Sequence, residues 1–73
     1  MRFDGYVKRK YDHGAEQLSS CRTPNQAMYV TLAKFAATAL GDPDELHEGE
    51  LWIETDGKVV FRFSIDECDW MPA

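Results

Sequence analysis

The first eleven residues alternate between largely apolar and largely polar positions. An alternation of period two is typical of a half-buried β-strand, and it puts Tyr6 on the face opposite the core. Only Arg9 interrupts the otherwise apolar set, which comprises Met1, Phe3, Gly5, Val7 and Tyr11. Residues 12–22 show no period and contain Gly14, Ser19 and Ser20. They are predicted to form a loop, with room for one helical turn around residues 15–18.

A helix is predicted from Thr23 to about Leu40. Thr23 is placed to cap it, proline fits the first helical position, and Gln26 completes a capping box. The glycine and proline that follow Leu40 end it. The predicted core face comprises Met28, Leu32, Phe35, Ala36 and Ala39.

The opposite side of this helix is short of charge, because Lys34 is its only charged residue. The positions assigned to that side are Ala27, Val30, Ala33 and Ala37. Two readings stay open. A loop, a second copy or a partner covers this Ala-rich face, or alanine is simply a good helix former there.

A cap-and-proline pattern at 42–45 predicts one short turn, and a hairpin follows at 50–55 and 58–64. We expect a three-residue loop, 55–57, with Gly57 in the left-handed conformation. This register places Ile53 opposite Val59 and Leu51 opposite Phe61 on the core face. On the outer face it pairs Trp52 with Val60, Glu50 with Arg62, and Glu54 with Lys58. Residues 66–71 extend the strand or form a turn, and Trp70 packs back on the domain.

These elements predict one α+β domain over residues 1–73. Its order is β-α-β-β, with an antiparallel sheet and one main helix packed on one face. The expected core comprises Phe3, Val7, Leu32, Phe35, Leu51, Ile53, Phe61 and Phe63.

Charge is distributed unevenly along the chain. The net charge is −5. Residues 1–41 carry six bases and three acids, whereas residues 42–73 carry two bases and ten acids. Such asymmetry indicates an acidic face that attracts a basic partner. The alternative is that the charge serves solubility and attraction between the two halves.

No catalytic or metal-binding pattern is found. The two histidines and two cysteines lack paired ligand spacing, the acids from Asp42 onward do not fit a calcium loop, and no nucleophilic triad or phosphate loop is present. We therefore expect a non-enzymatic protein without metal or cofactor. The basic cluster at 8–10 is outweighed by the net charge, so direct nucleic-acid binding is not expected.

The N-terminus has no apolar segment of the kind found in signal peptides, and no run is long enough to span a membrane. The expected location is the cytoplasm, and the host cytoplasm if a phage encodes the chain. Cys21 and Cys68 are then expected to be reduced.

The candidate partner-binding surface combines aromatic and acidic residues. Aromatic side chains within a charged rim are typical of interface hot spots. The alternative is that the C-terminal tail covers Trp52. The candidate residues are Tyr6, Trp52, Val60, Glu50 and Glu54, extended by Asp42, Asp44, Glu45 and Glu48.

The hairpin sequence Glu50-Leu51-Trp52-Ile53-Glu54-Thr55-Asp56-Gly57-Lys58-Val59-Val60-Phe61 lies in a short acidic chain. In size, charge and order of elements the chain resembles small phage and mobile-element accessory proteins, anti-CRISPR inhibitors in particular. The resemblance implies an inhibitor that occludes a basic surface of a nucleic-acid-handling complex. A homodimeric regulatory or antitoxin-like protein, paired through the Ala-rich helix, is the alternative.

Overall fold

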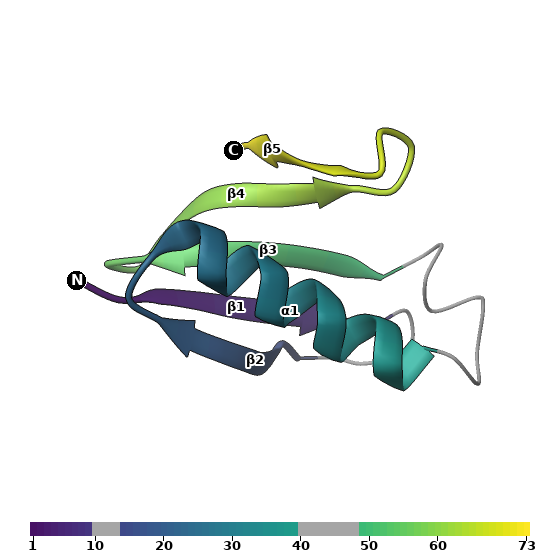
Figure 1. The fold of residues 1–73 in the computed structure, drawn as a ribbon, viewed down its shortest axis with the longest axis horizontal. Coiled ribbons are helices and arrows are strands. Elements are labelled where there is room, and N and C mark those ends of the chain that lie inside the picture. The colour runs from purple at the N-terminus through teal and green to yellow at the C-terminus, as the bar shows by residue number, and fades with distance from the viewer. Residues whose placement is uncertain (10–13, 40–48) are drawn as a thin grey trace.

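The computed structural model describes residues 1–9, 14–39 and 49–73. Within these ranges, five strands form one antiparallel sheet and a single helix packs on one of its faces (Figure 1). The α+β fold class is confirmed. The sheet order is β2-β1-β3-β4-β5. The elements are β1 (Phe3–Lys8), β2 (Glu16–Cys21), α1 (Pro24–Ala39), β3 (Glu50–Thr55), β4 (Lys58–Ser64) and β5 (Asp69–Pro72).

Strand β2 replaces the loop that was predicted over residues 12–22, and this prediction was wrong. The register between β1 and β2 skips Leu18, so a β-bulge interrupts the strand. As a result Leu18 and Ser19 are both buried although they are adjacent. The bulge therefore removes the period of two by which a strand is recognised.

The start of α1 agrees with the prediction. The amide of Gln26 donates to Thr23 Oγ1 over 3.3 Å, and the amide of Ala27 donates to the Thr23 carbonyl over 3.2 Å. The bond to the Thr23 hydroxyl satisfies one of the donors that a helix start leaves without partners, and the bond to the Thr23 carbonyl is the first within the helix. The predicted stop signals, Gly41 and Pro43, lie outside the described residues.

The buried side of α1 is rotated from the predicted one. Ala27 and Thr31 are completely buried and Phe35 nearly so, whereas Ala36 is exposed. Assigning Ala27 to the outside and Ala36 to the core was wrong. The reason is the close approach of α1 to β1, where only small side chains fit between helix and sheet.

Gly5 is the point of closest approach. A Cβ built on Gly5 would lie 1.8 Å from Thr31 Oγ1 and 2.5 Å from Ser19 Oγ. Those two hydroxyls share a buried hydrogen bond of 2.8 Å. A polar pair is tolerated in this core because each hydroxyl satisfies the other.

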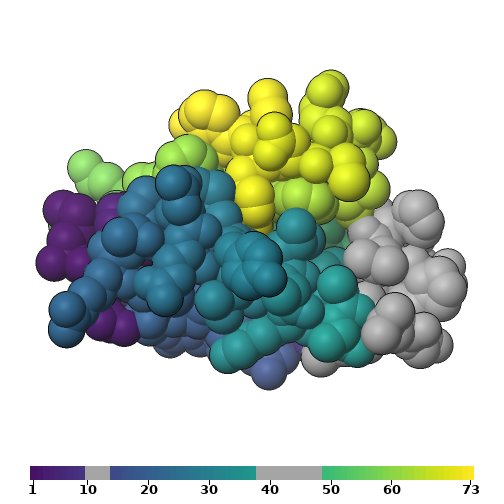
Figure 2. Space-filling view, in the orientation of Figure 1, coloured from purple at the N-terminus to yellow at the C-terminus, as the bar shows by residue number. Residues whose placement is uncertain are grey.

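Around this contact the apolar core comprises Val7, Leu18, Phe35 and Leu51, with Leu32, Phe63 and Trp70 packed against it. Ile53 is also fully buried. Of the expected core residues, Phe3 and Phe61 are only half-buried. The helix contacts β2, β1 and β3, and β4 and β5 extend beyond it (Figures 1 and 2).

The hairpin between β3 and β4 has a two-residue turn, so the three-residue loop was wrong. Thr55 pairs with Lys58, and both central residues have positive φ, 52° at Asp56 and 76° at Gly57. Positive φ at both positions is the requirement of a type I′ turn. The left-handed conformation expected at Gly57 is confirmed.

The predicted pairs across this hairpin were also wrong. A bulge at Val60 follows the pair of Glu54 with Val59, so that Ile53 meets Phe61 and Trp52 meets Arg62. The extra residue places the apolar side chains of both strands on one face. The predicted register reached the same result with a longer loop instead of a bulge.

Replacing Gly57 by valine should destabilise the protein by about 1–2 kcal/mol, because a β-branched residue is strained at positive φ. Urea unfolding followed by circular dichroism measures the change. Asp56→Asn is the matched control and should be nearly neutral, since asparagine suits this turn position. Equal effects of the two substitutions would contradict the turn assignment.

Side chains bond several backbone groups of the two edge strands. On β5, the amide of Ala73 donates to the Val60 carbonyl of β4. Because amides alternate in direction along a strand, those of residues 72 and 70 point outward. Pro72 has no N–H, so only the Trp70 amide remains. That amide donates instead to Asp69 Oδ1 over 2.8 Å. On β2, side chains bond three successive carbonyls: Lys34 Nζ to Leu18 O, Gln17 Nε2 to Ser19 O, and Arg2 Nη2 to Ser20 O. A strand added at either edge would have to compete with these side-chain bonds.

Candidate functional site

The face of the sheet opposite α1 is here called the outer face. None of the described helices or strands covers it. Trp70 lies on the helix side, edge-on to Phe63 with ring centroids 5.4 Å apart. Met71, opposite Arg62, stays exposed. The alternative that the tail covers Trp52 is thus wrong for Trp70, which packs back on the core as expected.

Two aromatic rings occupy the centre of the outer face. Tyr6 of β1 and Trp52 of β3 are direct cross-strand partners. Their ring centroids are 5.8 Å apart and their planes differ by 17°, which is a stacked arrangement. Both side chains are half-buried, so the pair presents part of its surface to solvent. Stacked pairs of this kind contribute about 0.5–1.5 kcal/mol beyond their buried area.

Two carboxylates stand beside these rings. Asp4 and Glu54 are also direct partners across β1 and β3. Trp52 Nε1 donates to Glu54 Oε2 over 2.8 Å, and Gln17 Nε2 donates to Asp4 Oδ1 over 3.4 Å. Like charges directly opposite each other destabilise a strand pair. The sheet nevertheless holds both carboxylates together, next to an aromatic surface.

These surroundings change the pKa of the Tyr6 phenol. Partial burial raises the pKa of Tyr6 above its usual 10.0, and the negative charges of Asp4 and Glu54 raise that pKa further. The folded state therefore favours neutral Tyr6. Its contribution to stability is complete below pH 10.0 and is lost as pH rises through the folded-state pKa.

We expect the phenolate absorbance of Tyr6, taken as the difference between the parent protein and Tyr6→Phe, to rise with a midpoint above pH 10.0. Asp4→Asn should lower this midpoint because it removes one of the negative charges. Tyr6→Phe should also keep more of its stability than the parent on alkaline titration. Parallel loss of stability in both proteins would contradict the assignment.

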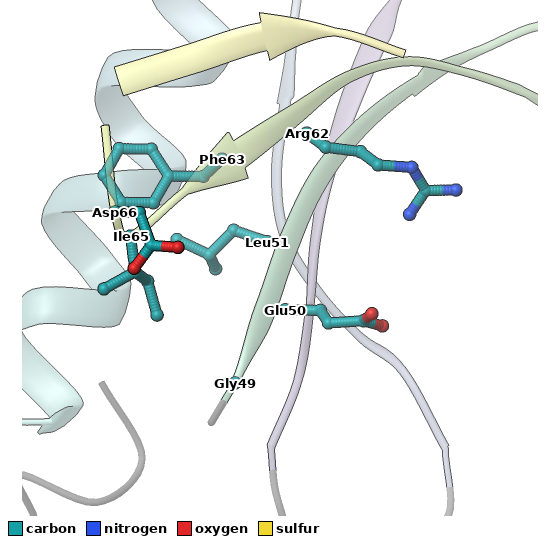
Figure 3. Close-up of a pocket in the computed structure, with 7 residues that line it drawn as sticks. All are labelled: Gly49, Glu50, Leu51, Arg62, Phe63, Ile65 and Asp66. Carbon is teal, nitrogen blue, oxygen red and sulfur yellow. The ribbon is translucent and has the colours of Figure 1, made fainter. Parts of the chain in front are cut away.

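Cationic side chains lie further out on the same face. Arg62 of β4 is the cross-strand partner of Trp52, and Lys8 of β1 is the cross-strand partner of Glu50. Figure 3 shows Glu50 and Arg62 pointing away from the helix, whereas Leu51 points toward it. The face as a whole therefore carries both signs, and its negative charge is concentrated at Asp4 and Glu54.

The structure brings together four of the predicted site residues: Tyr6, Trp52, Glu50 and Glu54. Val60 is not the partner of Trp52, because it is the extra residue in the bulge of β4. The predicted acids Asp42, Asp44, Glu45 and Glu48 lie outside the described residues.

Sequence reasoning missed two members of the site, Asp4 and Gln17. Asp4 had a usable signal, since it lies two residues before Tyr6 on an alternating strand. Gln17 had none, because its strand was taken for a loop.

An apolar groove lies on the other face, where β4 and β5 extend beyond α1. Its volume is about 410 Å³ and its lining includes Leu32, Phe35, Phe63 and Ile65. A smaller hollow adjoins it at the end of β3 and β4 (Figure 3). Gly49, which borders both, is the first described residue after the gap at 40–48.

Other features of the described residues add no second site. Cys21 and Cys68 are free thiols. No three metal-ligating side chains gather within residues 1–9, 14–39 and 49–73. In the same part of the chain, no helix has the length and apolarity that crossing a membrane requires. No protein-family model matches the chain, and comparison with curated proteins and with solved structures finds no match.

Proposed function

We propose that this chain is a non-enzymatic protein-binding module that occludes a basic surface of a nucleic-acid-handling complex of the CRISPR type. The observation that supports the proposal is the outer face, where the stacked pair Tyr6–Trp52 lies uncovered beside the carboxylates of Asp4 and Glu54. Tyrosine and tryptophan are enriched among residues that dominate binding energy. Carboxylates complement the basic channels that hold nucleic acid.

The side-chain bonds on the edge strands favour binding through a face. Side chains bond three carbonyls of β2 and the Trp70 amide of β5, and Pro72 has no N–H. A partner that adds a strand, the common way for a peptide to join a sheet, would have to compete with these bonds. The outer face remains, and its aromatic centre with a charged surround has the anatomy of an interface.

The test measures competition between this protein and nucleic acid for RNA-guided nuclease complexes. Increasing protein should reduce target-DNA binding by a susceptible complex. Trp52→Ala should weaken that inhibition by about 30-fold or more, the effect of losing a hot spot worth about 2 kcal/mol. Tyr29→Ala is the matched control, since Tyr29 is an exposed aromatic on α1. No competition with any nuclease complex tested would reject the proposal.

Charge should act mainly on the rate of association. Glu54→Lys places a cation beside Asp4 on the outer face. It should slow association with a basic partner most at low salt, because salt screens the electrostatic attraction between the two proteins. Stopped-flow binding at two salt concentrations measures this. Lys58→Glu, at the exposed hairpin end, is the opposite reversal and should not slow association. A salt-independent loss in Glu54→Lys would argue against electrostatic steering.

A homodimer through α1 is the second candidate, and one observation favours it. Tyr29 is 78% exposed, and Lys34, the one charged residue of α1, is turned to the Leu18 carbonyl at 2.7 Å. The remaining exposed side includes Ala33 and Ala37. If this face pairs two copies, light scattering should give twice the monomer mass, and Ala33→Glu should restore the monomer.

A further inference from the structure

We infer that the Tyr6–Trp52 pair receives an arginine side chain of the partner protein, with the guanidinium lying on the exposed rings and donating to Asp4 and Glu54. This inference rests on the proposed function and names the chemistry by which the outer face recognises its partner. It follows from the shape of the aromatic surface, from the hydrogen-bonding groups beside it, and from the placement of the remaining charges.

The two rings are stacked with their planes 17° apart, so each covers part of one face of the other and leaves its remaining surface for a partner. A planar, delocalised cation can stack on such an aromatic surface, and arginine does so more readily than lysine. Half-burial of both rings holds them in place before a partner arrives, so little ordering is required on binding.

The polar groups at this position accept hydrogen bonds and offer few donors. The indole N–H of Trp52 is already used by Glu54 Oε2. Each carboxylate has two oxygens, and the described contacts occupy one on each, leaving Glu54 Oε1 and Asp4 Oδ2 as acceptors from adjacent strands. A guanidinium presents several donors in one plane. A phosphate or carboxylate would meet repulsion instead.

Binding of a cation would also relieve an existing strain. Asp4 and Glu54 repel each other across the strand pair, and the same charges act on the Tyr6 phenol. Lys8 is opposite Glu50 and Arg62 is opposite Trp52, whereas Arg2 lies near Asp4 and donates to Ser20, the cross-strand partner of Asp4. With Arg2 bonded to Ser20, the attraction for a partner's arginine comes from the carboxylates of Asp4 and Glu54 beside the rings.

The test uses hexa-arginine and hexa-lysine amides as probes, with the indole N–H signals of Trp52 and Trp70 followed by nuclear magnetic resonance. Hexa-arginine should shift the Trp52 signal and leave Trp70, on the opposite side of the sheet, nearly unmoved. Its apparent affinity should exceed that of hexa-lysine at least about threefold, because only the guanidinium both stacks and donates in a plane.

Two double variants with the same change in net charge distinguish binding at this site from general electrostatic attraction to an acidic protein. Asp4→Asn with Glu54→Gln should weaken hexa-arginine binding about tenfold. Asp66→Asn with Glu67→Gln, which neutralises two exposed acids in the β4–β5 connection, should change it less than twofold. Equal affinity for the two peptides, or equal weakening in the two double variants, would overturn the inference.

Three further outcomes are distinguished. A concentration-dependent Trp52 shift without peptide, abolished by Arg62→Ala, would assign the arginine to a second copy and overturn the inference. Failure of the peptides to shift Trp52 while nuclease competition persists would overturn the arginine assignment and leave the proposed function standing. Peptide binding without competition would support the arginine site and reject the nuclease as its partner.

Discussion

A single methyl group added at Gly5 is expected to remove most of the protein's stability. The new Cβ of Gly5→Ala would lie 1.8 Å from Thr31 Oγ1, which is fully buried within α1. The helix must then move away from β1, at a cost of about 3 kcal/mol, the upper end of the usual range for overpacking. A domain this small has a total stability of only about 3–5 kcal/mol. Urea unfolding followed by circular dichroism should show the loss.

The obstructing side chain provides the rescue for this variant. Adding Thr31→Ala to Gly5→Ala removes the nearest atom and should restore part of the lost stability, although Thr31→Ala alone is destabilising because Ser19 loses its partner. Gly14→Ala is the matched control, since a Cβ there meets nothing within 4 Å. If Gly5→Ala were as stable as Gly14→Ala, the described contact between helix and sheet would be wrong.

The second large effect is expected from a pair of identical substitutions on α1. Ala27→Leu adds three carbon atoms at a completely buried position and should destabilise by about 2–3 kcal/mol. Ala36→Leu makes the same change at an exposed position and should be nearly neutral, because leucine is also a good helix former. Both variants are compared by thermal unfolding at one protein concentration.

This pair separates the two orientations of the helix. The apolar pattern alone put Ala36 in the core and Ala27 outside, which predicts the reverse order of stability. A larger loss in Ala36→Leu than in Ala27→Leu would restore the sequence-based orientation.

Elements with a regular pattern were predicted well. The alternation around Val7 gave strand β1 with the correct face, and the cap at Thr23 gave the helix start. The hairpin was recognised because alternating residues flank Asp56-Gly57. In these cases local chemistry and burial agree, so the pattern carries enough information.

Elements shaped by packing were not predictable. Both bulges, at Leu18 and Val60, insert a residue whose position depends on the neighbouring strand. The orientation of α1 depends on the absence of a side chain at Gly5, which no helical pattern reports. At the candidate site, Tyr6 and Trp52 could be placed on one face, but their stacking required the β1–β3 pairing, which joins distant parts of the chain.

That pairing also constrains how the protein folds. Strand β1 lies inside the sheet, with β2 following closely in sequence and β3 arriving only after α1. The units β1-β2-α1 and β3-β4-β5 can begin locally, yet the core residues Val7 and Leu51 meet only when the units join. Closing so long a loop is slow, so folding on the order of milliseconds is expected rather than microseconds. Until then β1 has an unpaired edge, to which a strand of another chain can bind. The longer this state lasts, the more chains can associate incorrectly.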